Sequence, residues 1–240
     1  MLRQTAIALG PELCRQIVFI GGAIAPVLQT DPALPKVRPT KDVDAIAAAA
    51  SYTDMEALQD ALRTAGFTQS GILAAERERF HAHRWTTPHG GAFDLVPAGS
   101  FLGGTGSAVD RFVLNTSWAL DIARFDSDPV VIRHASPVAF LALKWAAYND
   151  RGRDDPRTSH DLEDIIALIA SRSTITEEAA EAPAHIKALL DSGIRDILDN
   201  PDTDELVDGH LGLSGSEAER VRRTVSTRLR AILTTSEASR

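Results

Sequence analysis

A short segment of the sequence begins with two glycines and ends near two aspartates. Gly21 and Gly22 follow an apolar run, and Asp42 and Asp44 stand in the later run TKDVDAI. A glycine pair where a strand meets a helix lets the backbone approach a triphosphate closely and offers it N–H groups. Because side chains alternate along a strand, two carboxylates separated by one residue point to the same face. The segment therefore predicts a phosphate site together with a cation site.

A third carboxylate is expected beside this pair. The stretches RFHAHRWTT and AFDLVPAG, with a turn at PHGG between them, predict a β-hairpin that places Asp94 on a neighbouring strand. Oxygen ligands suit Mg²⁺, which takes one or two carboxylates and leaves its other positions to water and phosphates. Two such ions about 3.5–4 Å apart can hold the attacking and leaving oxygens of an in-line displacement. We therefore predict that Asp42, Asp44 and Asp94 bind two ions of Mg²⁺, or of Mn²⁺.

The composition narrows the classes of protein that can carry this site. The chain has 240 residues, of which 44% are hydrophobic and 24% charged, as in ordinary globular proteins with a sizeable core. It shows neither an apolar run of membrane-spanning length nor the order of a signal peptide, so we expect a cytoplasmic protein without a membrane partner. The net charge of −8 argues against a surface that coats nucleic acid and leaves room for a local basic patch. Cys14 is the only cysteine, which excludes an intrachain disulfide and a cysteine-based metal site.

Apolar periodicity predicts the elements that position the aspartates. Gln16–Ile20 predicts a buried strand, and the glycine pair predicts a turn that opens a helix. The stretch Asp31–Pro39 contains three prolines and predicts a loop before the aspartate strand. Thr53 and Glu56 predict a capping box for a helix that ends at Gly66. A second hairpin is expected from SWALDIARF through DSDP to VVIRHA.

The later part of the sequence has a helical pattern. Ser136-Pro137 predicts the start of a helix through VAFLALKWAAYND, and Thr158-Ser159 can cap the next one, HDLEDIIALIA. Two further helical stretches are TEEAAEAPAHIKALLDSGIRDILDN and SEAERVRRTVSTRLRAIL. We therefore predict an α/β (α+β) protein in two domains, a mixed-sheet core at residues 1–134 and an α-helical domain at 135–240.

The order of these motifs resembles the nucleotidyltransferase superfamily related to DNA polymerase β. Members of that superfamily have a G-G or G-S turn, a D-x-D on the following strand and a third acidic residue on a later strand. The matching positions are Gly21, Gly22, Asp42, Asp44 and Asp94. The resemblance implies a nucleotidyltransferase-like core that moves an NMP from an NTP to an acceptor hydroxyl with Mg²⁺. It also implies that Asp94 helps to deprotonate the acceptor.

The run RPTKDVDAI is similar to the R-x-T-x-D-h-D stretch of the bacterial AbiEii/AbiGii (MenT-like) toxin nucleotidyltransferases. That group also has a downstream lysine and a later K-D-x-x-D element, to which Lys144 and HDLED are similar. The resemblance extends to about Ala170. In this sequence Ala23 supplies no hydroxyl where many relatives have Ser or Thr, His160 stands where the group often has Lys, and the proline-rich loop is longer than in the shortest members.

This group resemblance implies a substrate, a biological role and partners. The residues expected to bind the NTP are Gly21, Gly22, Thr40, Lys144 and Asp161. The implied acceptor is a tRNA 3′ end, and the implied role is that of a toxin that pairs with an antitoxin protein. A small-molecule acceptor, as in antibiotic-modifying relatives, stays open, and so does a non-catalytic nucleotide- or partner-binding module with the same fold.

Several of these residues also have a purely structural interpretation. Lys144 lies in an apolar helix, from which it can extend its ammonium to solvent or bind the triphosphate as a point charge. Asp161 and Asp164 lie at i, i+3 on one helical face and can complement the helix dipole or serve the site.

Three further features are interpreted mainly as structural. The H-x-H of His81 and His83 lacks a third metal ligand at convincing spacing. The stretch GGTGS lacks the lysine of a P-loop, does not clearly open a helix and predicts a loop. The C-terminal arginines predict a solvated helix face or, alternatively, a groove for an RNA backbone. These arginines are Arg220, Arg223, Arg228 and Arg230.

Overall fold

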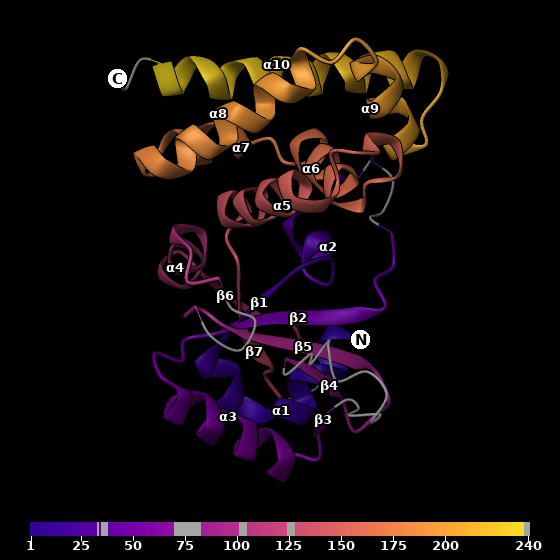
Figure 1. Cartoon of the computed structure of the whole chain (residues 1–240). Coiled ribbons are helices and arrows are strands. Elements are labelled where there is room, and N and C mark those ends of the chain that lie inside the picture. The colour runs from indigo at the N-terminus through magenta and orange to yellow at the C-terminus, as the bar shows by residue number, and fades with distance from the viewer. Residues whose placement is uncertain (33, 35–37, 70–82, 101–104, 124–127, 238–240) are drawn as a thin grey trace. The chain divides into compact units, whose positions relative to one another are not determined.

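A computed structural model describes residues 1–32, 34, 38–69, 83–100, 105–123 and 128–237, which form two compact units (Figure 1). The first unit comprises Met1–Ile24 and Pro39–Ser136, and the second comprises Ala25–Arg38 and Pro137–Arg240. The chain therefore passes between the units three times, at 24–25, 38–39 and 136–137. The predicted α+β fold class is confirmed. The segment Ala25–Arg38, expected within the first domain, belongs to the second unit instead.

A mixed sheet forms the centre of the first unit, with strand order β3-β4-β5-β2-β1-β7-β6 in the described residues. The strands are β1 (Ile17–Ile20), β2 (Asp42–Ala47), β3 (Thr68–Gln69), β4 (Arg84–Thr86), β5 (Ala92–Pro97), β6 (Trp118–Asp121) and β7 (Val131–His134). Strand β1 pairs antiparallel with β2 and parallel with β7, and β2 pairs parallel with β5. Both predicted hairpins are present, as β4–β5 and β6–β7, although residues 79–82 and 124–127 of their sequences lie outside the described residues.

Helices α1 (Leu2–Gln16) and α3 (Tyr52–Thr64) lie together along one face of the sheet (Figure 1). Helix α1, which the sequence did not predict, is interrupted at Gly10, where φ is +72° and Pro11 follows. The central strands β1, β2 and β5 contribute side chains that are fully enclosed, such as Phe19, Val43 and Phe93. The aspartate-bearing strands therefore contribute to the buried core of the unit.

The start of α3 differs from the prediction. The capping box expected at Thr53 and Glu56 is wrong, because Ser51 is the N-cap and its hydroxyl accepts a hydrogen bond from the Asp54 N–H. The Asp54 carboxylate accepts in turn from the Ala50 N–H, 3.2 Å away. Ser51 and Asp54 thus take the roles expected of Thr53 and Glu56, and the helix begins two residues earlier than predicted.

The GGTGS stretch also differs from the prediction, because its serine opens a helix. Ser107 is the N-cap of α4 (Ala108–Asn115), where Ser107 and Asp110 form a reciprocal capping box. Residues 103 and 104 of this stretch lie outside the described residues. The helix predicted after the glycine pair is shorter than expected, because it consists of the single turn of α2 (Ala25–Leu28).

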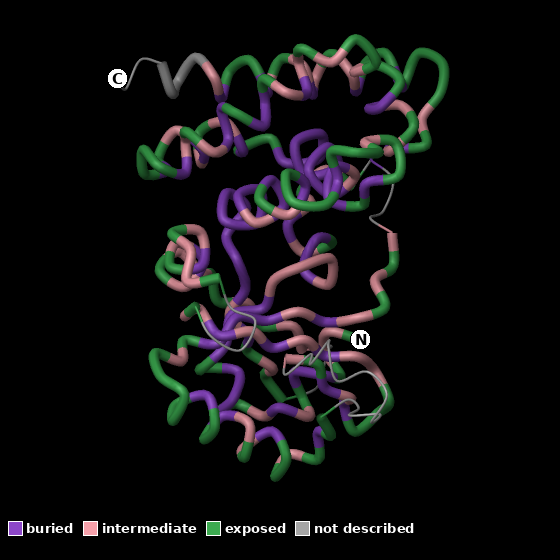
Figure 2. The backbone as a smooth tube through the Cα atoms, viewed as in Figure 1, coloured by how far each residue is buried: buried purple, intermediate pink, exposed green. Residues whose placement is uncertain are grey.

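Helices account for all the regular structure described in the second unit. Besides α2 they are α5 (Pro137–Arg151), η1 (Pro156–Thr158), α6 (His160–Ser171), α7 (Ile175–Ala180), α8 (Ala184–Leu198), α9 (Thr203–Leu211) and α10 (Gly215–Glu237). Ser159 caps α6 as predicted, and α6 is buried along nearly its whole length (Figure 2). Among the helices that the structure describes, none is both long enough and apolar enough to cross a membrane.

The C-terminal end of α6 is held by groups from distant parts of the chain. Arg228 of α10 donates to the carbonyls of Ile169 and Ala170 at 2.7 and 2.6 Å. The backbone N–H groups of Thr30 and Asp31 donate to the Ser171 carbonyl. Burial lowers the pKa of the Arg228 guanidinium from its ordinary value. These donors satisfy carbonyls that a helix end would otherwise leave unpaired.

Two arginines add to the connection between α6 and the segment Ala25–Arg38. Arg172, directly after α6, donates to the Leu28 carbonyl at 3.0 Å. Near the other end of α6, Arg38 forms an ion pair with Glu163 at 3.1 Å. The segment is therefore attached to both ends of one buried helix.

We predict that Arg228→Ala destabilises the protein by about 2 kcal/mol, because two buried helix-end carbonyls lose their donor. The matched control is Arg223→Ala on the same helix. The Arg223 side chain is 74% exposed, so its removal should change the stability by less than about 0.5 kcal/mol. Urea denaturation measures both variants. Equal midpoints for the two would show that the cap contributes nothing.

Candidate metal centre

Strand pairing brings the three predicted aspartates together. Strands β2 and β5 run parallel with Asp44 directly opposite Asp94, and Asp42 lies two residues earlier on β2. Because side chains alternate along a strand, all three point to the same face of the sheet. One carboxylate oxygen from each aspartate can be chosen so that the oxygens all lie within 4.8 Å of one another. This acidic group can hold a metal ion.

The glycine turn lies directly beside this group. Strand β1 pairs with β2 so that Ile20 is opposite Asp44, and Gly21 follows at a φ of +69°. A Cβ on Gly21 would lie 2.0 Å from Asp44 Oδ2, so both the backbone angle and the available space require glycine. At Gly22 the nearest atoms, those of Thr40, would lie at an ordinary 3.4 Å. The first glycine thus brings the backbone against the carboxylate.

The hydroxyl of Thr40 donates to Asp42 Oδ1 at 2.8 Å. The sequence predicted that Thr40 binds substrate, and in the structure its partner is this carboxylate of the acidic group. A short hydrogen bond from a neutral donor orients Asp42 without cancelling its charge.

Arg84 is a member of the site that the sequence did not predict. It stands opposite Asp94 in the β4–β5 pair, and its Nε and Nη2 donate to Asp94 Oδ1 and Oδ2 at 2.8 and 2.6 Å. Its Nη2 also lies 3.7 Å from Asp42 Oδ2. The hydrogen bond and charge of Asp94, aided by Asp42 and Asp44, raise the pKa of the Arg84 guanidinium above its ordinary value. Counting residue pairs outward from the turn of the predicted hairpin could have placed Arg84 opposite Asp94.

The charges of the site are not balanced. Three carboxylates meet one guanidinium, which leaves the group with a formal charge of −2 at neutral pH. Like charges at this separation repel one another, and a divalent cation is the partner that relieves this repulsion. The donor set consists of hard oxygen atoms, as Mg²⁺ and Mn²⁺ prefer.

Lys144 forms a separate cluster in the second unit. Its ammonium lies 3.0 Å from Asp161 Oδ1 and 2.6 Å from Asp164 Oδ2, and Arg151 also binds Asp161. The Asp164 contact is an ion pair without hydrogen-bond alignment. The side chains of Lys144 and Asp164 are only 11% and 1% exposed. Lys144 therefore does not extend into solvent, and to bind a phosphate it must exchange these two carboxylates.

The predicted site residues thus divide into two groups. Gly21, Gly22, Thr40 and the three aspartates lie in the first unit, and Lys144 and Asp161 lie in the second. His81 and part of the first hairpin lie outside the described residues. Neither a scan against models of known protein families nor a search of curated proteins finds a match for this chain.

The C-terminal arginines are partly used in the fold. Arg228 caps α6, and Arg223 lies 3.6 Å from Glu219 on its own helix. Arg222, their neighbour on α10, forms ion pairs with Asp204 and Asp208. Arg228 therefore has partners within the fold, and the alternative of an RNA groove along these arginines stays a prediction.

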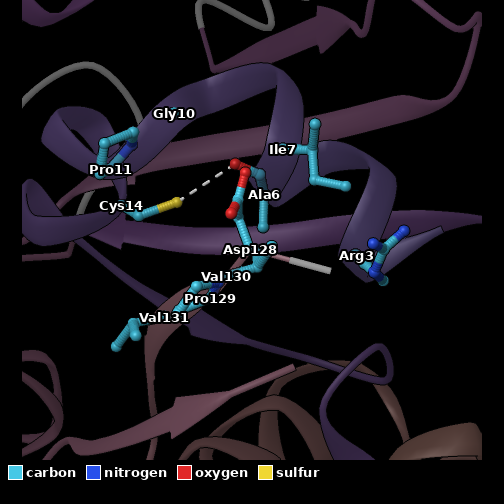
Figure 3. Close-up of a pocket in the computed structure, with 10 residues that line it drawn as sticks. All are labelled: Arg3, Ala6, Ile7, Gly10, Pro11, Cys14, Asp128, Pro129, Val130 and Val131. Atoms are coloured by element: carbon cyan, nitrogen blue, oxygen red, sulfur yellow. Dashed lines mark hydrogen bonds between the residues drawn. The ribbon is translucent and has the colours of Figure 1, made fainter. Parts of the chain in front are cut away.

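A cavity of about 360 Å³ lies elsewhere in the first unit, between α1 and the start of β7 (Figure 3). Its lining includes Arg3, Ile7, Asp128 and Val131, and none of the predicted site residues. Cys14 also lines this cavity. Burial raises the pKa of its thiol to about 11, so it stays protonated at neutral pH.

We predict that Gly21→Ala lowers the stability by about 2 kcal/mol or more, because alanine is strained at positive φ and its Cβ would displace the Asp44 carboxylate. Gly22→Ala is the matched control and should change the stability by less than about 1 kcal/mol. Thermal unfolding followed by circular dichroism compares the two variants. A fully stable Gly21→Ala protein would contradict the close approach at Asp44.

We predict that Lys144→Met destabilises the second unit by about 3 kcal/mol, because it leaves Asp164 charged and buried without its cation. Adding Asp164→Asn to this variant should recover part of the loss, whereas Asp164→Asn alone should destabilise the protein. A double-mutant cycle by urea denaturation measures the difference. Unchanged stability in Lys144→Met would instead favour a solvent-exposed lysine.

Proposed function

We propose that this protein is a divalent-cation-dependent nucleotidyltransferase that moves an NMP from an NTP to an acceptor hydroxyl. The observation that carries the proposal is the grouping of Asp42, Asp44 and Asp94 on adjacent strands, with ligand oxygens within 4.8 Å of one another. The backbone of Gly21 lies directly against this group. Carboxylates for metal and a glycine turn for phosphate thus meet at one point, in the order that the sequence motif implies.

The donor set of the site fits Mg²⁺. Carboxylate oxygens are hard ligands, and the group already binds one cation, the guanidinium of Arg84. Bound Mg²⁺ would polarise the α-phosphate and neutralise charge that develops on the leaving pyrophosphate. Asp42 and Asp44 would hold the ion that accompanies the triphosphate, and Asp94 would complete the second position.

The residues of the chain supply the remaining parts of the reaction. A bond forms between the acceptor oxygen and the α-phosphorus, while the bond from that phosphorus to the β-phosphate oxygen breaks and pyrophosphate leaves. The proton of the acceptor hydroxyl passes to Asp94, the candidate general base. The turn at Gly21 and Gly22 lets backbone groups approach the phosphates without a side chain between them.

Two arguments about the acceptor lead to different proposals, one from the family resemblance and one from the charge of the protein. Similarity to the AbiEii/AbiGii toxin group favours a tRNA 3′ end, and with it a toxin role and an antitoxin partner. The net charge of −8 and the pairing of Arg222, Arg223 and Arg228 favour a small hydroxylated acceptor, because an RNA needs a local basic face. Both acceptors belong to the same transfer chemistry.

We predict that the purified protein transfers label from at least one α-labelled NTP, with Mg²⁺ present, to total RNA or to a hydroxylated small molecule. Chelation with EDTA should abolish transfer. Asp44→Asn should lower it by about 100-fold or more, because it removes a metal ligand. The matched control is Asp60→Asn, which neutralises an exposed helix aspartate and should leave the rate unchanged.

The acceptor that becomes labelled separates the two alternatives. Labelled RNA with a steep salt dependence supports the tRNA acceptor, and labelling of a small molecule alone supports the other. Transfer that survives both EDTA and Asp44→Asn would contradict the proposal. Binding of NTP without transfer to any acceptor would favour a non-catalytic module.

A further inference from the structure

Arg84 engages one of the three aspartates far more completely than the other two. Both oxygens of Asp94 accept hydrogen bonds from the guanidinium, at 2.8 and 2.6 Å, in a parallel two-bond arrangement. The hydrogen bond that Asp42 accepts from Thr40 comes from a neutral hydroxyl, and the guanidinium lies 3.7 Å from Asp42. Paired arginine–carboxylate contacts of this kind are among the strongest that side chains make.

The backbone fixes this contact. Arg84 and Asp94 are direct partners in the antiparallel β4–β5 pair, and the next pair holds two fully buried rings, Trp85 and Phe93. The strands therefore cannot shift to separate the two side chains without disturbing the core. The Asp94 side chain is 14% exposed and that of Arg84 is 45% exposed. The carboxylate is thus held in place, whereas the guanidinium has solvent into which it can move.

We propose that Arg84 is an internal cation of the metal centre, which competes with a divalent ion for Asp94. The inference rests on the proposed metal-dependent function. An ion that uses Asp94 must displace at least one of the two guanidinium hydrogen bonds, whereas an ion that binds only Asp42 and Asp44 displaces neither of them. Arg84 therefore makes the two proposed ion positions unequal and sets the cation concentration at which the second one fills.

The inference assigns Arg84 a positioning role. With Arg84 in place, Asp94 is held at the correct point on the sheet and its charge is compensated. Once the guanidinium is displaced, its planar set of donors is available beside the site, and such donors match phosphate oxygens as well as carboxylates. Arg84 consequently links metal binding to Asp94, the candidate general base, because Asp94 is either paired with the guanidinium or released from it.

The test is Mn²⁺ binding by the full chain, measured by calorimetry and by the electron paramagnetic resonance signal of free Mn²⁺. We expect Arg84→Gln to bind Mn²⁺ about fivefold more tightly than the wild type, because removing a partly exposed arginine–carboxylate competitor is worth about 1 kcal/mol. Arg84→Lys, which keeps the charge and loses the two-bond geometry, should lie between the two. It also serves as the second variant if the glutamine protein folds poorly.

Arg63→Gln is the matched control for charge. It removes the same positive charge from the same unit, and its side chain is 48% exposed against 45% for Arg84. In the structure Arg63 pairs with Asp60 and not with the acidic group. Its affinity for Mn²⁺ should therefore equal that of the wild type.

A double-mutant cycle with Asp94→Asn tests the mechanism of competition. In that background Arg84 keeps only its longer contact with Asp42, at 3.7 Å, so Arg84→Gln should strengthen Mn²⁺ binding much less than in the wild type. The proposal is overturned if Arg84→Gln binds Mn²⁺ no more tightly than the wild type, or if the full gain persists in Asp94→Asn.

Failure of the proposed function gives a different result. Wild-type binding that is lost in Asp44→Asn keeps the metal centre whatever Arg84 does. Binding that is absent from the wild type and from Arg84→Gln alike overturns the metal centre and the role of Arg84 together.

Discussion

The parallel pairing of β2 with β5 imposes the main electrostatic constraint on the first unit. It sets Asp44 directly beside Asp94, and like charges on neighbouring strands destabilise a sheet. The surrounding structure offsets this cost, because β4 supplies Arg84, and Thr40, two residues before β2, supplies a hydroxyl. The close approach of Gly21 belongs to the same arrangement, since a side chain there would push the Asp44 carboxylate away. The sheet thus carries excess negative charge, which a bound cation can neutralise.

The second unit handles its charges by burial and pairing. Helix α6 carries Asp161 and Asp164 on the face that meets Lys144 of α5, so that a cation and two anions lie inside an apolar bundle. Arg151 completes the balance at Asp161. Removal of Lys144 would take the ion-pair partner away from the buried Asp164 carboxylate.

Local patterns predicted the aspartate strand, both hairpins and the helices α3, α5, α6, α8 and α10, because the order of neighbouring side chains shows a period of two or of 3.6 residues. They did not predict α1 or α9. The contacts that decide the chemistry were harder to predict. The pairing of Arg84 with Asp94 depends on the turn, in which Thr87 pairs with Gly91, and a count one residue longer would place Arg84 opposite Leu95. The partners of Lys144 depend on how two helices pack, which no local pattern specifies.

The segment Ala25–Arg38 has a consequence for dividing this protein into parts. Its buried leucines, Leu28 and Leu34, belong to the second unit, although its ends join the glycine turn and the aspartate strand of the first. Truncation after Ser136 would remove the helix to which this segment is attached, and would leave those leucines exposed to water. Proteolytic cleavage at the same point would leave two fragments joined through the contacts of the segment with α6. We therefore expect that the sheet unit and the helical unit have to be expressed as one chain, because no single cut in the chain separates them.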